Sequence, residues 1–168
     1  MVNWDLIIAV CGLLIALSAS IATIWQGKLT REHNRLSVTP ILAIEGTVVL
    51  NQPAAIVLKN TGLGPAILHS YIISVDGKPI SSGAFSPRSE AIHLIGLDTF
   101  PWRGWSFSQS DTLANGDSRS LFEILDPVTD PRSIDRIKLA FNRLSLEIKY
   151  TSIYGEQHEV EAHNIMAP

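Results

Sequence analysis

The residues of this 168-residue chain that could bind a metal are five histidines, one cysteine and a C-terminal run of carboxylates. No histidine stands in a pattern such as H-E-x-x-H, and Cys11 lies inside an apolar segment, where it cannot complete a zinc site. The closest approach to a ligand set is the stretch from Glu156 to His163. On a strand, Glu159, Glu161 and His163 share one face, but charges on a last strand also discourage pairing between sheet edges. We therefore favour a solvated edge strand over a weak metal site, and we predict no metal ligand.

Motifs of the common catalytic sites are also missing from the sequence. Gly62-Leu63-Gly64-Pro65 has two closely spaced glycines, but it lacks the third glycine, the following lysine and the strand-to-helix context of a phosphate-binding loop. No serine lies in a G-x-S-x-G elbow. The sequence therefore predicts that the protein is not an enzyme and that it holds no cofactor.

Charge is unevenly distributed along the chain, whose net charge is −3. Lys28, Arg31 and Arg35 against Glu32 make the segment that follows Trp25 basic. The rest of the chain, from Ser37 on, holds ten lysines and arginines against fourteen acidic residues. An acidic domain without a basic stripe argues against nucleic acid as a partner.

Residues Leu6 to Ile24 are 19 consecutive uncharged positions, rich in Leu, Ile, Val and Ala. As a helix they cover roughly 28 Å, close to the thickness of about 30 Å of a bilayer's hydrocarbon core. Trp4 and Trp25 bracket the segment, as indole rings do at membrane surfaces. We therefore predict one transmembrane helix.

A buried helix of a soluble protein would be shorter and keep a polar stripe. A cleavable signal peptide, with Ser18-Ala19-Ser20 as its processing site, would begin with Lys or Arg.

The flanks of this segment predict its orientation, because positive charges near a membrane segment tend to stay in the cytoplasm. Asp5 is the only charged side chain before it. Lys28, Arg31 and Arg35 follow it on one side of a helical continuation, Gln26 to Leu36, from which they can reach lipid phosphates. We expect a single-pass protein of the bacterial inner membrane, with its N-terminus outside and its domain in the cytoplasm.

One face of the predicted membrane helix carries small residues. Gly12, Ala16 and Ser20 form the small-xxx-small pattern of packed membrane helices, while Leu, Ile and Val crowd the other side. Small residues are also common in membrane helices that do not pack, so both interpretations stay open. The expected partners are the lipid bilayer and either further copies of the chain or another membrane protein.

The remaining chain, residues 37–168, has the pattern of a mainly β domain. Thr39-Pro40 ends the helix, because proline disfavours the α conformation in the residue before it. Turns are marked by Asp76-Gly77, Asn115-Gly116-Asp117 and Tyr154-Gly155-Glu156. About seven short strands between such turns predict an immunoglobulin-like (Ig-like) β-sandwich. The clearest strands are Ile41 to Leu50, Ala54 to Lys59, Ile67 to Val75, Ser120 to Ile124, Leu144 to Thr151 and Gln157 to Ala162.

One short helix is predicted from Pro131 to Phe141, with Asp130 as its N-cap. The alternation of its apolar residues would also fit a strand. Residues 81–110 are interpreted as a long irregular connection with a turn of helix near Ser89 to Leu94. Its aromatic side chains either close the end of the sandwich, which we favour, or form an exposed recognition loop. These side chains are Phe100, Trp102, Trp105 and Phe107.

The turn Asn60-Thr61-Gly62-Leu63-Gly64-Pro65-Ala66 directly follows the strand Ile56-Val57-Leu58-Lys59. Asn60 can hydrogen-bond to the backbone two residues on, while Gly62 and Gly64 allow a positive φ where the chain reverses. Together with Asn115-Gly116-Asp117 and the late segment Ile148 to Gly155, this N-x-G-x-G-P-A turn resembles a widespread class of uncharacterised bacterial membrane-anchored β-sandwich proteins. The resemblance implies the fold and the anchoring, and it brings no activity. Asn60, Gly62, Gly64 and Pro65 are therefore expected to be structural.

The chain is thus interpreted as an anchor, residues 1–36, and a β-sandwich domain, residues 37–168. The expected function is that of a non-enzymatic, self-associating binding or interaction module, without a ligand that the sequence identifies. One alternative is a membrane effector whose cytoplasmic domain senses a ligand or a phage-triggered signal. Another is an extracytoplasmic assembly or transport subunit.

The small-residue face leads to a first prediction. Replacing Gly12 and Ala16 together by leucine should weaken self-association, because bulky side chains hold two helix backbones apart. A membrane two-hybrid assay measures this, with Leu13→Ala and Leu17→Ala together, on the opposite face, as the matched control. Unchanged association of the Gly12 and Ala16 variant would rule out this face as the contact.

Overall fold

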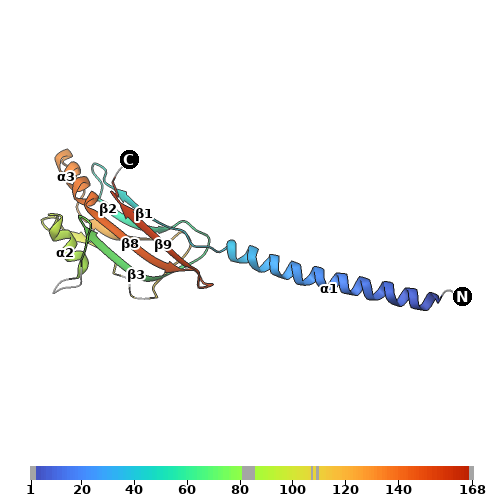
Figure 1. Cartoon of the computed structure of the whole chain (residues 1–168). Coiled ribbons are helices and arrows are strands. Elements are labelled where there is room, and N and C mark those ends of the chain that lie inside the picture. The colour runs from blue at the N-terminus through green and yellow to red at the C-terminus, as the bar shows by residue number, and fades with distance from the viewer. Residues whose placement is uncertain (1–2, 81–85, 107, 109, 167–168) are drawn as a thin grey trace. The chain divides into compact units, whose positions relative to one another are not determined.

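The computed structural model describes residues 3–80, 86–106, 108 and 110–166. The chain divides into two compact units, Met1–Ser37 and Val38–Pro168. The first unit contains the helix α1, and the second, called the domain below, contains all the strands and two shorter helices (Figure 1).

The helix α1 (Trp4–Leu36) runs without interruption for 33 residues, which corresponds to a length of roughly 50 Å. It therefore contains both the apolar segment and the polar continuation that the sequence predicts. The side chains of Trp4, Leu6 and Leu36 lie outside the described part of the structure. Every other side chain of α1 is exposed.

The domain consists of two antiparallel sheets. Sheet A has the order β1 (Leu42–Thr47), β2 (Ala55–Asn60), β7 (Ser118–Ile124) and β5 (Trp102–Arg103). Sheet B has the order β4 (Lys78–Pro79), β3 (Ala66–Val75), β8 (Leu144–Thr151) and β9 (Gln157–His163), and the short strand β6 (Thr112–Leu113) also pairs with β3. Two helices, α2 (Pro87–Leu94) and α3 (Pro131–Asn142), gather at one end of the strands (Figure 1).

The strand order follows that of a constant-type immunoglobulin sandwich, in which one sheet runs A-B-E-D and the other C-F-G. The strands β1-β2-β7-β5 and β3-β8-β9 have these orders, with β4 added beside β3. The structure therefore confirms the predicted sandwich of two antiparallel sheets, which follows a long apolar helix in the sequence. The short strands β4, β5 and β6 do not show in the sequence pattern, because two residues are too few for a period to be recognised.

Alternation along the strands places the core between the sheets. In β8, Leu144, Leu146, Ile148 and Tyr150 are buried, while the residues between them are half-buried or exposed. Sheet A contributes Phe122 among others to the same cluster. One apolar core thus holds the two sheets together, and it lies wholly within the domain.

The turn at Asp76-Gly77 joins β3 to β4 as the sequence predicts. Both residues have positive φ, 50° at Asp76 and 76° at Gly77. A two-residue hairpin turn needs such values to match the right-handed twist of the strands that it joins. The Arg143 guanidinium lies 2.6 Å from Asp76 Oδ2. Its hydrogen bond holds the pKa of the Asp76 carboxyl below its usual value.

The described residues of the domain form two helices, where the sequence predicts one short helix and a turn of helix near Ser89 to Leu94. In α3, Asp130 is the N-cap and accepts a hydrogen bond from the Arg132 amide, so the helical interpretation of this segment holds. The expected turn of helix near Ser89 to Leu94 is part of α2, which begins two residues earlier because Ser86 is its N-cap and Pro87 its first residue.

The aromatic cluster belongs largely to the core. Phe100, Trp102 and Trp105 are half-buried and pack against the buried apolar residues, as the favoured interpretation has it. The Arg119 guanidinium lies 5.7 Å from the centre of the Trp105 ring. Phe107 lies outside the described residues.

Core packing leads to a second prediction. Phe122 is fully buried, so Phe122→Ala should lower the free energy of unfolding by about 3–5 kcal/mol. Leu139→Ala is the control, because Leu139 is 69% exposed on α3 and its loss should change stability by less than about 0.5 kcal/mol. Denaturant unfolding of the detergent-solubilised protein, followed by circular dichroism, measures both values. Equal effects of the two substitutions would contradict the described core.

Candidate functional site

The residues of the N-x-G-x-G-P-A turn hold the first residues of the domain. The turn between β2 and β3 lies against the segment 38–41, which leads into β1, and we call the two together the junction clamp. Thr61 donates its amide to Ile41 O at 2.8 Å, and Leu63 donates its amide to Thr39 O at 3.1 Å. The turn therefore binds the segment through its backbone.

Asn60 is the centre of the junction clamp. Its side chain is fully buried, and its Oδ1 accepts from the amides of Gly62 at 3.0 Å and Ile41 at 3.3 Å. Its Nδ2 donates to Gly64 O at 2.7 Å and to Leu113 O at 3.0 Å. An amide side chain has two donors and room for two acceptor bonds. All four are used, which allows this polar group to be buried without an unmet hydrogen bond.

The expected reason for Gly62 and Gly64 is wrong. Neither belongs to the residues with positive φ, so neither is needed for a left-handed backbone. A Cβ on Gly62 would lie 2.6 Å from the Thr39 carbonyl oxygen, and one on Gly64 would lie 2.5 Å from the Val38 carbonyl carbon. Both are much closer than van der Waals contact, so the glycines are required because another segment of backbone passes against them.

The remaining turn and anchor residues lie where their sequence positions imply. Pro65 is the last residue of the turn in the junction clamp, directly before β3. In α1, an added Cβ on Gly12 would meet nothing within 4 Å, so this face is open within the chain. The other anchor residues whose side chains the structure describes are all exposed, namely Ala16, Ser20, Trp25, Lys28, Arg31 and Arg35. Trp4, as noted, has its side chain outside the described part.

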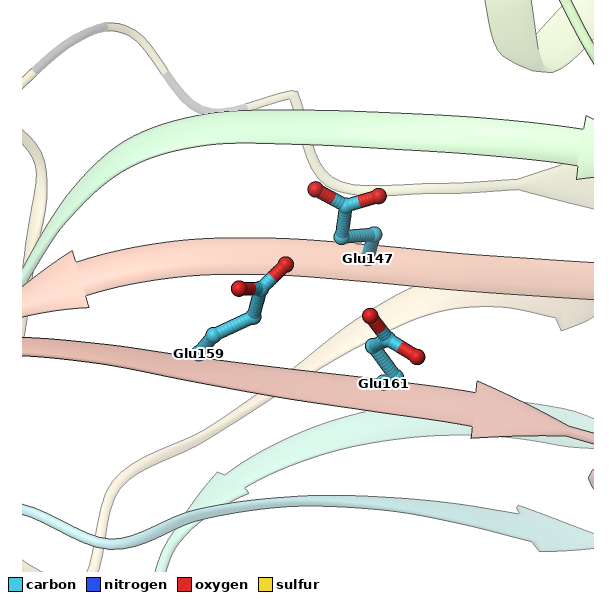
Figure 2. A group of neighbouring side chains, drawn as sticks. All are labelled: Glu147, Glu159 and Glu161. Atoms are coloured by element: carbon cyan, nitrogen blue, oxygen red, sulfur yellow. The ribbon is translucent and has the colours of Figure 1, made fainter.

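Three carboxylates converge on the outer face of sheet B. Glu147 comes from β8, and Glu159 and Glu161 come from β9 (Figure 2). One oxygen from each lies within 4.8 Å of the others. Together they could offer three oxygen ligands of the kind that Mg²⁺ or Ca²⁺ prefers.

One lysine partly compensates the charge of this acidic cluster. Lys149 Nζ lies 3.0 Å from Glu147 Oε1 and 3.7 Å from Glu159 Oε1. The hydrogen bond from Lys149 lowers the pKa of Glu147. The pKa of Glu159 is raised, chiefly by its side-chain hydrogen bond to Glu147. The cluster therefore forms a local ion-pair network on a solvated surface, which agrees with a charged outer face on the last strand.

The structure changes the membership of the cluster that the sequence indicated. His163 shares the outer face with Glu159 and Glu161 and lies 3.4 Å from Glu161, but the third carboxylate is Glu147. The period-2 pattern of β8 predicts that Glu147 points outward. Its position beside Glu161 depends on the register of β8 and β9, in which these two residues pair.

The comparisons with known proteins do not show the function of this chain. No family model matches the chain, and no curated protein matches it. Among solved structures it is distantly similar to the archaellum periplasmic stator protein FlaG from Sulfolobus acidocaldarius. The TM-score is 0.29 at 13% identity, over 74% of this chain and 100% of that chain. A TM-score this low supports no statement about function, and the resemblance to bacterial membrane-anchored proteins stays a prediction.

The junction clamp leads to a third prediction. Asn60→Ala should lower the free energy of unfolding by about 3 kcal/mol or more, because it leaves buried amides and carbonyls without partners. It should also speed hydrogen exchange of the Ile41 and Leu63 amides, which mass spectrometry of peptides measures. Asn115→Ala, at an exposed turn position, is the control and should change neither quantity. A stable Asn60→Ala variant with unchanged exchange would show that the clamp does not depend on this amide.

Proposed function

We propose that the chain is a non-enzymatic, membrane-tethered interaction module, in which α1 spans a bilayer and the domain binds a partner. The observation that carries the proposal is the exposed apolar surface of α1. Nineteen uncharged residues, Leu6 to Ile24, lie on a helix whose described side chains are all exposed. In water such a surface would be strongly unfavourable, whereas a bilayer covers it.

Polar groups of the helix also fit a hydrocarbon environment. The hydroxyls of Ser18, Ser20 and Thr23 donate to the carbonyls of Ile15, Ala16 and Ala19 at 2.8, 2.9 and 2.8 Å. A hydroxyl that bonds to its own helix needs no water. The alternative of a core helix in a soluble protein is disfavoured, because the domain has a complete core of its own and the described side chains of α1 are not buried.

A tether is useful only if its end is fixed to the domain. The residues that follow Ser37 are bound by the junction clamp through Thr39 and Ile41, and Ile41 leads directly into β1. Pulling on the helix would therefore load the hydrogen bonds of the clamp first and sheet A next. This is the arrangement expected of an anchored module, and it supports tethering without indicating what the module binds.

The side of the membrane is proposed from charge. Lys28, Arg31 and Arg35 lie after the apolar segment and only Asp5 lies before it, so we propose a cytoplasmic domain at a bacterial inner membrane. Self-association through Gly12, Ala16 and Ser20 belongs to the same proposal. A sensor that perturbs the membrane when its ligand binds would use the same topology.

An extracytoplasmic assembly subunit is the second candidate, and it places the domain on the opposite side. FlaG is by its name a periplasmic stator protein, but that likeness is too remote to assign a side to this chain. The charge bias favours the cytoplasm, and the two candidates share the tether and the sandwich. Topology therefore separates them.

Reporter fusions after Pro168 provide the fourth prediction. In a bacterial host, a phosphatase that is active only in the periplasm should give no signal, and a fluorescent protein that folds in the cytoplasm should give a strong one. Replacing Lys28, Arg31 and Arg35 by glutamine should raise the phosphatase signal, because it removes the charge bias. Lys138→Gln, in the domain, is the control. The reverse pattern in the unaltered chain would establish the extracytoplasmic candidate.

Tethering itself is tested in the same cells. The fusion should remain with membranes after washing with high salt and alkaline carbonate, and detergent should release it. Leu14→Arg together with Leu17→Arg should move it to the soluble fraction, because each charge near the centre of a membrane helix costs about 2.5–3.5 kcal/mol. Release of the unaltered chain by salt alone would overturn the proposal.

A further inference from the structure

A cavity of about 320 Å³ lies at the edge of β3. It occupies the stretch of the strand between the pairing with β6 at Ile67 and the pairing with β4 at Ser74. None of the described residues that line it is an aspartate or a glutamate. Its polar lining residues are His69, Ser70, Tyr71, Ser86, Arg88 and Ser106.

Arg88 gives this cavity a positive charge. Its Nη2 donates to Ser106 Oγ, whereas its Nη1 is buried and has no hydrogen-bond partner. In the part of the chain that the structure describes, no carboxylate lies within ion-pair distance of it. The charge reaches neighbouring groups: burial raises the pKa of Tyr71, and the Arg88 charge acts against that rise. Buried guanidinium N–H groups are normally paired, so the positive charge of Arg88 is not compensated among the described residues, and a ligand in the cavity would meet the N–H groups of Arg88 other than Nη1.

The start of α2 also lines this cavity. Ser86 is the N-cap, and Pro87 and Arg88 are the first residues of the helix, where the helix dipole is positive. Glu90 is the acidic residue of the first turn, but it does not line the cavity. Seryl hydroxyls and the imidazole of His69 can donate to the same acceptor.

We propose that this cavity binds a phosphate group, either as inorganic phosphate or as a phosphate monoester. A phosphate offers more acceptor oxygens than a carboxylate, and the lining supplies more donors than a carboxylate can use. A cavity of about 320 Å³ also exceeds what a small ion fills, which leaves room for an organic group on a monoester. The proposal makes no use of α1, so it stands or falls independently of membrane tethering.

The chain provides a matched control for Arg88. The helix α3 begins with the same three residue types as α2, Pro131-Arg132-Ser133 against Pro87-Arg88-Ser89. Arg132 is exposed, and the N-cap of α3 is Asp130, whose carboxylate would repel an anion. Arg132→Gln therefore removes an equivalent arginine without touching the cavity.

The fifth prediction concerns phosphate binding by the full-length protein in detergent, measured by calorimetry and by thermal unfolding. Inorganic phosphate, glycerol 3-phosphate and acetate are titrated at constant ionic strength, with chloride as the reference. Both phosphates should raise the midpoint of unfolding saturably, and acetate should not. Arg88→Gln should weaken phosphate binding by at least about tenfold, since a charge-assisted hydrogen bond is lost, while Arg132→Gln should leave it unchanged.

Each outcome decides something. Tighter binding of glycerol 3-phosphate than of inorganic phosphate would indicate a monoester, and equal binding would indicate the free anion. Arg88→Lys keeps the charge but not the planar fork, so it should fold and bind with intermediate affinity even if Arg88→Gln does not fold. No saturable response to phosphate, an equal response to acetate, or equal losses in Arg88→Gln and Arg132→Gln would overturn the proposal.

Discussion

One buried amide determines how the chain enters its domain. Asn60 has no exposed surface and uses both oxygen lone pairs and both hydrogens. Its partners come from three separate segments: the strand entrance at Ile41, the turn at Gly62 and Gly64, and the end of β6 at Leu113. No apolar residue of similar size could hold three backbone segments in this way. The amides and carbonyls that now bond to Asn60 would then be left unpaired in a dry interior. The two glycines complete the arrangement by allowing the backbones to approach.

This constraint links the anchor to the sandwich. Four residues separate Ser37 from β1, and the clamp bonds Thr39 and Ile41 among them. The chain is therefore bound to the turn from Thr39 onward. Beyond that point the chain follows β1, whose partner β2 ends at Asn60 itself. The N-x-G-x-G-P-A turn is thus more than a local reversal, since it connects β2 of sheet A to β3, the first strand of sheet B.

The sequence predicts well what depends on periodicity and turn chemistry, and poorly what depends on contacts between distant segments. The alternation in β8 and the Asp76-Gly77 turn are local, so strand and hairpin could be predicted from them. Gly62 shows the limit. The sequence indicates that this position needs a glycine, but the need comes from a neighbouring backbone segment that lies about twenty residues away in the sequence. Glu147 shows it again, because its place beside Glu161 follows only from the register of β8 and β9.

Local compensation of charge distinguishes the two polar clusters of the domain better than net charge does. The three carboxylates around Glu147 have Lys149 among them, so their charge is partly neutralised within the chain, and the rest is screened by water. Arg88 is in the opposite situation, with a buried Nη1 and no carboxylate among the described residues around the cavity. Interactions grow stronger as the local dielectric falls, so one uncompensated, partly buried arginine outweighs a distant excess of exposed acidic groups. An acidic domain can therefore still hold an anion where its nearest charge is positive.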